Sequence, residues 1–237
     1  ADKQFNSYWF GSGTPTYLIN MLRKFGVNPA DIAPTEAVAS AFDAPTENMK
    51  TITPLLYQSG YVTIRHYDND TQLYTLDIPN KEIRVGLYDC LLPNYLEGMY
   101  AQNGDVTIAK MSLLIRRNDM NGALQLLQDF LATVPYCNVT NYEGHYQQML
   151  FIIFSLLTNF LVDVEVHTHK GRVDIVLLTA TNLYLMELKL NSDATTAMRQ
   201  INLNEYAKRF ALCGRPVTKV GINFDATKGN IDGWTIE

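Results

Sequence analysis

The chain has few cysteines and no segment typical of a secretory signal. Its three cysteines, Cys90, Cys137 and Cys213, are odd in number and far apart, so they predict neither a disulfide framework nor a zinc site. The start, ADKQFNSYWF, lacks the basic and apolar regions that open secreted chains. These absences favour a reducing, cytoplasmic setting. Because the first residue is not an initiator Met, we expect the chain to begin part-way into a longer protein.

The chain also lacks a very long apolar run and a run of basic residues. The longest apolar stretch, MLFIIFSLLTNFLV at 149–162, is shorter than the roughly 18 residues of a membrane span and predicts a buried helix. The formal net charge is −5, whereas non-specific binding to nucleic acid depends mainly on cations. We therefore expect no membrane partner. A nucleic-acid partner would have to be held by local patches or by a bound metal ion.

The composition, 47% hydrophobic and 18% charged, predicts one large domain or two modest ones with apolar cores. The first half predicts helices at 14–26 and 47–58, a hairpin of strands at 61–67 and 72–78, and a helix at 80–96. Helices followed by a hairpin indicate a winged-helix-like domain, which we place at residues 1–97. Helices at 105–117 and 119–133 then predict a helical connector over 98–139.

Two features of the first half fit nucleotide or DNA binding poorly. The run GSGT at 11–14 lacks the Gly-Lys-Ser/Thr and the preceding strand of a Walker phosphate loop, so it indicates a plain helix start. The helix at 47–58 carries Lys50 as its only cation. A packing or protein-contact role is therefore favoured over DNA reading for this helix.

The second half alternates between helices and strands. It predicts a helix at 142–161, strands at 162–170, 172–179 and 182–190, a helix at 192–213, and strands at 216–224 and near 234–237. This order indicates an α/β sandwich with a mixed sheet, which we place at residues 140–237.

Three charged residues, Asp174, Glu187 and Lys189, lie inside the apolar run GRVDIVLLTATNLYLMELKL at 171–190. An ionised group in an apolar setting is costly unless it is paired or holds a metal ion. If the two strands pair around Ala180-Thr181, Asp174 faces Glu187, with Cβ atoms roughly 4.5 to 5.5 Å apart. Lys189 then lies on the same face. Two facing carboxylates predict a site for a divalent cation such as Mg²⁺.

A second interpretation of these charges needs no metal ion. Antiparallel sheets often have one polar face in water, and on such a face Lys189 would simply bridge the two acids.

The runs GRVDIVL, YLMELKL and AMRQI, with Tyr206 downstream, resemble the PD-(D/E)XK nuclease superfamily, specifically the nuclease-like domain at the C-terminus of bacterial AAA-ATPase-like proteins. In the first half, YWFGSGTPTYLINML, LLYQSGYVTI and LDIPNKEIR resemble the segment that follows the ATPase core of that family. In that family a proline usually precedes the first acid, and Val173 takes its place here. The Walker motifs of the core are missing from these residues, so we predict no ATP hydrolysis by this chain.

The resemblance implies a restriction-endonuclease-like fold and a role for each matching residue. Asp174, Glu187, the Leu188 carbonyl and Glu143 would hold Mg²⁺ or Mn²⁺. Lys189 would orient the attacking water or stabilise the transition state. The remaining matches are Gln200, expected to position Lys189 or a phosphate oxygen, and Arg172, a candidate phosphate contact.

His167 and His169 alternate on one face beside the expected site. Two histidines alone do not make a metal site, so we interpret them as surface residues.

Two functions follow from these expectations. The first is a metal-dependent phosphodiesterase that acts on DNA, with RNA less favoured. The second is a non-catalytic module that uses the same fold to bind a partner or nucleic acid for an ATPase domain of the same family.

Overall fold

The computed structural model describes residues 16–43, 45, 49–96, 99–135, 142–159, 161, 163–169, 172–203 and 214–237. The chain divides into two compact units, Ala1–Leu91 and Leu92–Glu237. The two helices that we expected to connect the domains belong to the second unit. Over the described residues, no helix combines the length and the apolar character needed to cross a membrane.

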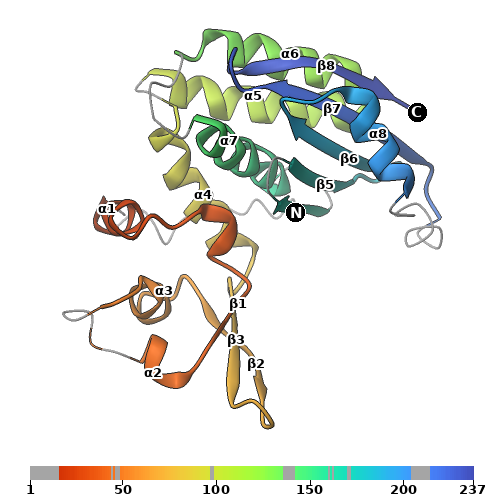
Figure 1. The fold of residues 1–237 in the computed structure, drawn as a ribbon. Helices are drawn as coiled ribbons and strands as arrows, with labels where there is room; N and C mark the ends of the chain where they lie inside the picture. Colours follow the sequence, from red (N-terminus) through yellow and green to blue (C-terminus); the bar gives the residue numbers. More distant parts are fainter. Residues whose placement is uncertain are drawn as a thin grey trace, which may run out of the picture. The chain divides into compact units, whose positions relative to one another are not determined.

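The first unit orders its elements as helix, strand, helices and a two-stranded hairpin, followed by one more helix (Figure 1). They are α1 (Thr16–Phe25), η2 (Pro29–Asp31), β1 (Thr35–Ala37), α2 (Ala39–Phe42), α3 (Thr53–Gln58), β2 (Thr63–Asp68), β3 (Leu73–Asp77) and α4 (Lys81–Leu91). Its antiparallel sheet has the order β1-β3-β2.

The predicted hairpin is confirmed, and local hydrogen bonds explain its turn. The Asp68 carboxylate accepts hydrogen bonds from the backbone N–H groups of Asp70, at 2.8 Å, and Thr71, at 3.3 Å. Aspartates favour turns because their side chains bond their own backbone in this way. On the helical side of the unit, the Phe42 ring packs edge-on against Tyr57 and Tyr74, with centroid distances of 4.7 and 5.2 Å.

The helix expected at 47–58 is shorter than predicted. Residues 46–48 lie outside the described residues, 49–52 are not helical, and α3 begins at Thr53. Pro54 stands in the first turn. A proline ring clashes with the carbonyl four residues earlier, so a helix cannot run through it without a kink. The strand β1 and the helix α2 have no counterpart in the prediction.

The second unit consists of helices packed on a five-stranded sheet. Its elements are η4 (Leu92–Asn94), α5 (Met99–Arg116), α6 (Met120–Thr133), α7 (Tyr142–Leu156), η5 (Leu157–Asn159), β4 (Asp163–His169), β5 (Arg172–Leu178), β6 (Leu183–Leu190), α8 (Ala194–Leu203), β7 (Val217–Asp225) and β8 (Asn230–Ile236). The sheet order is β4-β5-β6-β7-β8. β6 and β7 are parallel and the other neighbours are antiparallel, so the mixed α/β sheet is confirmed.

Helices cover both faces of this sheet. On one face, Met198 and Ile201 of α8 pack against Leu183 and Leu185, and Figure 1 shows α8 alongside β6 and β7. On the other face, the Tyr184 hydroxyl lies 3.1 Å from Asn118 Oδ1, just after α5. The remaining contacts on that face include Trp234 to Asn121 of α6 and Tyr146 of α7 to Phe224.

The apolar run at 149–162 contributes to this second face, as predicted for a buried helix. Within α7, the consecutive residues from Met149 to Phe154 are all buried. A helix that is apolar all round belongs in a protein interior or a membrane. Here the sheet provides the interior, because α7 packs on β4 and β5.

Candidate metal and phosphate site

Asp174 of β5 and Glu187 of β6 are directly paired across the antiparallel hairpin. The pairing runs from Arg172 opposite Lys189 to Leu178 opposite Leu183. The predicted facing of the two acids is therefore confirmed. Side chains of a directly opposed pair point to the same face of a sheet, with Cβ atoms about 4.5 to 5.5 Å apart.

The turn of this hairpin depends on a side chain because Ala180-Thr181 is not a favoured tight-turn pair. The hydroxyl of Thr179 accepts hydrogen bonds from the backbone N–H groups of Asn182, at 2.9 Å, and Thr181, at 3.3 Å. The backbone N–H of Thr179 donates to the Asn182 carbonyl at 2.9 Å. Thr179 thus closes the turn and sets the register that pairs the two acids.

Lys189 lies next to Glu187 on the same face. Its Nζ is 3.8 Å from Glu187 Oε1, which is an ion-pair distance and longer than a normal hydrogen bond. The Glu187 side chain is only 1% exposed and that of Lys189 is 19% exposed. The interpretation of a solvated polar face is therefore wrong for Glu187, although Lys189 does contact it.

Gly221 explains why Glu187 is buried. Gly221 of β7 is the parallel neighbour of Glu187. A Cβ atom on Gly221 would lie 2.5 Å from the Ala194 carbonyl oxygen and 2.8 Å from the Met198 nitrogen. The N-terminal half of α8 therefore lies directly on the strand beside Glu187, closer than any side chain at this position would permit.

The first turn of α8 is fixed by Asp193, the residue before it. The Asp193 carboxylate accepts a hydrogen bond from the Thr196 N–H at 2.7 Å and from the hydroxyls of Thr195 and Thr196. These hydrogen bonds lower the pKa of Asp193 to about 2, and the bond from the Thr195 hydroxyl has the largest effect. An aspartate in this place is a favourable helix cap.

Asn223 is a polar residue near the site that the sequence analysis did not single out. It is the parallel neighbour of Lys189, and its side chain is 7% exposed. Asn223 Oδ1 accepts a hydrogen bond from the Ser192 N–H at 3.0 Å. The signal was present in the sequence, because Asn223 interrupts the apolar run VGINF in the same way as Asp174 interrupts its strand.

Of the other predicted site residues, the structure describes the side chains of Leu188 and Gln200 but not those of Glu143 and Arg172. Leu188 lies between Glu187 and Lys189, with its side chain fully buried. Gln200 is half-buried on α8, one residue before Ile201, which packs on the sheet. Glu143 belongs to α7 and Arg172 to β5. The side chains of Glu143 and Arg172 lie outside the described residues, as does Tyr206.

The two histidines occupy β4. His167 is exposed and is the direct neighbour of Asp174 across the β4–β5 pair. His169 is paired with Arg172, and its side chain lies outside the described residues.

The donor set suits a hard divalent cation. In the part of the chain that the structure describes, no three His, Cys, Asp or Glu side chains form a group that could hold a metal ion. Two paired carboxylates nevertheless match the chemistry of Mg²⁺, which takes one or two carboxylates and completes its shell with water and phosphate oxygens. Asp174 and Glu187 therefore fit such an ion in kind and number.

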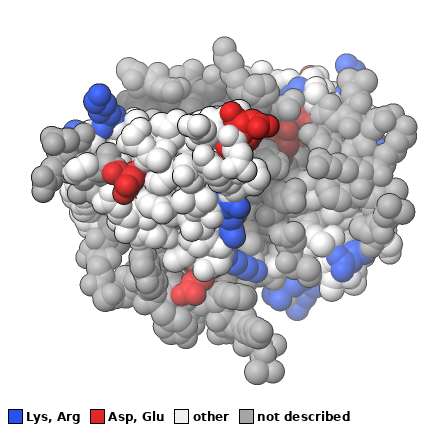
Figure 2. Space-filling model, turned by 90° about the horizontal axis from the view of Figure 1, so that it is seen from below, with Lys and Arg blue, Asp and Glu red and all other residues white. Residues whose placement is uncertain are grey.

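The described part of one face of the protein offers little attraction to a polyanion. In the view of Figure 2, Lys and Arg side chains occur singly or in small groups among uncharged surface and acidic side chains. The described part of this face therefore carries no broad basic surface. This agrees with the formal net charge of −5.

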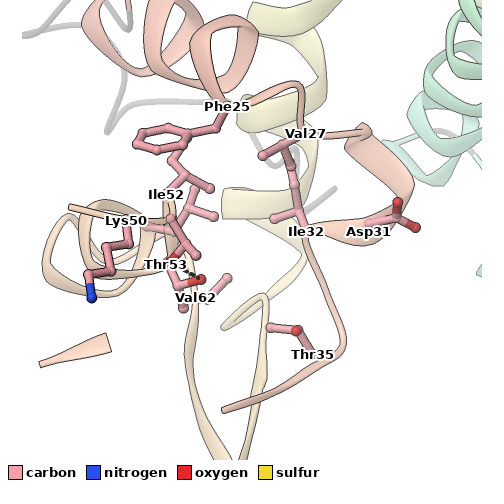
Figure 3. Close-up of a pocket in the computed structure, with 11 residues that line it drawn as sticks. Phe25, Val27, Asp31, Ile32, Thr35, Lys50, Ile52, Thr53 and Val62 are labelled. Atoms are coloured by element: carbon pink, nitrogen blue, oxygen red, sulfur yellow. Dashed lines mark hydrogen bonds between the residues drawn. The ribbon is translucent and has the colours of Figure 1, made fainter. Parts of the chain in front are cut away.

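A separate pocket of about 250 Å³ lies in the first unit. Its lining is mainly apolar, from residues such as Phe25, Ile32 and Ile52. Figure 3 shows that its two charged side chains, Lys50 and Asp31, extend away from the other labelled residues. The described lining therefore brings no charged groups together, although the hydroxyls of Thr51 and Thr53 are 3.3 Å apart. The paired acids of the second unit remain the better site.

Comparison with known proteins supports this choice. Residues 141–234 match the family model of the PD-(D/E)XK nuclease superfamily, whose members typically use divalent metals. The chain is also similar to "Uncharacterized protein in vnfD 5'region" of Azotobacter chroococcum mcd 1, with 29% identity over 250 aligned positions. That alignment covers 99% of this chain and 47% of the relative, so the chain spans about half of the relative's length. No solved structure matches the chain.

Proposed function

We propose that residues 140–237, most of which match the PD-(D/E)XK nuclease superfamily, form a metal-dependent phosphodiesterase that acts on DNA. The observation that carries the proposal is the direct pairing of Asp174 with Glu187, with Lys189 at 3.8 Å from Glu187, inside the matching segment. Two acids and a lysine on one face of a sheet supply both a cation site and a local positive charge.

Each residue has a distinct role in this proposal. Asp174 and Glu187 would hold Mg²⁺ or Mn²⁺, with the Leu188 carbonyl and Glu143 as further ligands. A bound divalent cation supplies Lewis acidity, which activates water and neutralises charge on a phosphate. Lys189 places its ammonium group beside this position and would orient the attacking water or stabilise the charge that develops on the scissile phosphate. Gln200 would position Lys189 or a phosphate oxygen.

Arg172 would contact a phosphate oxygen next to the scissile bond. It is directly opposite Lys189 across the β5–β6 pair, so both residues lie at the same end of the hairpin. A guanidinium group suits phosphate recognition because its donors form two parallel hydrogen bonds.

We further propose that the first unit is a winged-helix-like domain and that an ATPase domain of the same protein family is the partner. The order helix, strand, two helices and hairpin, with the sheet order β1-β3-β2, supports the first point. The resemblance of the first half to the segment that follows an ATPase core supports the second. The scattered cysteines support a cytoplasmic location.

A nicking assay tests the enzymatic proposal. The purified chain, given Mg²⁺ or Mn²⁺, is expected to convert supercoiled plasmid to the nicked form, and Lys189→Ala is expected to abolish this. Lys219→Ala is the matched control, since Lys219 lies on the same sheet and bonds Asn202 at 2.6 Å. Cleavage that persists in Lys189→Ala would refute the assignment.

The non-catalytic alternative has one observation in its favour. The described residues bring no third His, Cys, Asp or Glu side chain to the two carboxylates, so a site that holds no metal is compatible with the geometry. This alternative predicts no cleavage and no stabilisation by metal. A rise in melting temperature with Mn²⁺ that is lost in Asp174→Ala would count against it.

A further inference from the structure

We infer that Asn223 is a positioning residue for Lys189, acting through the loop that joins β6 to α8. The kinetic part of this inference rests on the proposed function, whereas the structural part does not. Asn223 is the parallel neighbour of Lys189, so both side chains lie on the α8 face of the sheet. The pairing therefore makes the two side chains neighbours on this face.

The Asn223 side chain ties the loop after Lys189 to β7. Its Oδ1 accepts the Ser192 N–H at 3.0 Å, and Ser192 follows Lys189 by three residues. Asn191 adds two more hydrogen bonds to β7 and the residue after it, both at 2.8 Å. Its N–H donates to the Phe224 carbonyl, and its side-chain Oδ1 accepts from the Ala226 N–H. The residues directly after β6, Asn191 and Ser192, are therefore held against β7 by these hydrogen bonds.

A bulge in β8 holds the Asn223 amide from its other side. Asn223 pairs with Gly233 and Phe224 with Ile231, so Asp232 is the extra residue between them. Bulges redirect side chains and are frequent next to active sites. Asp232 Oδ2 lies 3.5 Å from Asn223 Nδ2, and its Oδ1 accepts Lys228 Nζ at 2.9 Å. Contacts at both ends thus fix the orientation of the amide.

Asn223 is buried, but the position beside it in β8 is open. A Cβ atom on Gly233, the neighbour of Asn223 in β8, would meet nothing within 4 Å. The α8 helix covers the neighbouring position at Gly221 but leaves this one open. The row Lys189, Asn223, Gly233 therefore leads from the lysine beside the buried Glu187 to open space at Gly233. A lysine at such a boundary needs a tether if its ammonium group is to stay beside Glu187.

Removing the amide should release Lys189. In Asn223→Ala, we expect acylation of Lys189 by an amine-reactive ester, followed by mass spectrometry and normalised to the exposed Lys110, to rise roughly fivefold through local opening of the loop. The turnover number for plasmid nicking should fall roughly tenfold with KM within about twofold, because small misplacements of catalytic groups are costly. The Mn²⁺-induced rise in melting temperature should be retained, since Asp174 and Glu187 are unchanged.

Asn202 offers a matched control, because it makes another side-chain hydrogen bond to β7. Asn202 Oδ1 accepts Lys219 Nζ at 2.6 Å and ties the other end of α8 to β7. Asn202→Ala should leave both Lys189 acylation and the turnover number at wild-type values. The double variant Asn223→Asp with Asp232→Asn keeps the acceptor for the Ser192 N–H and exchanges donor and acceptor at the second contact. Lys189 acylation should therefore stay within about twofold of wild type.

Asn223→Ser provides a second test if the alanine variant fails to fold, because its hydroxyl is too short to reach Ser192. Wild-type acylation of Lys189 in Asn223→Ala or Asn223→Ser, or an equal increase in Asn202→Ala, would overturn the inference. If the wild-type protein cuts no DNA under any metal, the proposed function fails on its own. The acylation rates then still decide whether Asn223 positions Lys189.

Discussion

Gly221 of β7 lies directly beside Glu187 of β6, and backbone atoms of α8 occupy the space that a side chain at Gly221 would need. The absence of a side chain at Gly221 thus allows α8 to come close enough to bury Glu187. A helix at this distance excludes water from the carboxylate. A low-dielectric setting strengthens the interactions of Glu187 with nearby charges.

Gly221→Ala should force α8 away from the sheet. Its Cβ would meet main-chain atoms of Ala194 and Met198, which cannot swing aside as a flexible side chain can. We expect a loss of about 1 to 3 kcal/mol in the free energy of unfolding, measured with urea. Gly233→Ala is the control, because open space surrounds that position and the change should be within about 0.5 kcal/mol. Equal effects at both glycines would contradict the explanation.

Lys189 should stabilise the fold through its ion pair with Glu187. Removing one partner of a fully buried ion pair costs roughly 3 to 5 kcal/mol, and since Lys189 is 19% exposed we expect about 1 to 3 kcal/mol for Lys189→Met. Adding Glu187→Gln to this variant should restore part of the loss, because no buried charge remains. Urea unfolding of the two single variants and the double variant gives the coupling energy, and a coupling near zero would show that the pair does not interact in the folded protein.

Asp193 should give the protein a stability component that depends on acid pH. Its folded-state pKa, about 2, lies below the ordinary 3.8, so its contribution is complete above the ordinary value and is lost as the pH falls through about 2. Asp193→Asn can still cap α8 but cannot titrate. The difference in melting temperature between wild type and Asp193→Asn should therefore shrink from about pH 5 to about pH 2. A difference that stays constant over this range would exclude the effect.

Thr179→Val should loosen the hairpin that pairs the acids. The substitution keeps the shape of the side chain but removes the hydroxyl that bonds Asn182 and Thr181. We expect a loss of about 1 to 3 kcal/mol in urea unfolding, because buried backbone groups lose their partner. Thr181→Val, at an exposed position of the same turn, should change stability by less than about 0.5 kcal/mol. A larger loss of stability in Thr181→Val than in Thr179→Val would show that Thr179 is not the residue that closes the turn.

The sequence was sufficient to predict the hairpin register and the order of elements in the second unit. If the turn falls at Ala180-Thr181, the spacing places Asp174 opposite Glu187, and the structure confirms this pairing. Alternation along a strand also placed Lys189 correctly beside Glu187. These relationships are local, and local patterns in a sequence report them directly.

Relationships between distant segments could not be predicted in the same way. The burial of Glu187 depends on how closely α8 approaches β7, which the pattern of charges in β6 does not contain. The polar residue Asn223 could be seen in the sequence, but its contact with Ser192 could not, because Ser192 belongs to a loop 31 positions earlier. The predicted start of α3 was wrong for another reason, since the ring of Pro54 limits where the helix can begin.

The pairing of Asp174 with Glu187 also has a consequence for the order in which the site is assembled during folding. The two acids are thirteen positions apart in the chain and meet as soon as one hairpin closes, whereas Lys189 and Asn223 are thirty-four positions apart and meet only after β7 has joined the sheet. Closing a short loop has a small entropic cost, and contacts of low sequence separation form early. The part of the site that would hold a cation can therefore form before the part that steadies the lysine.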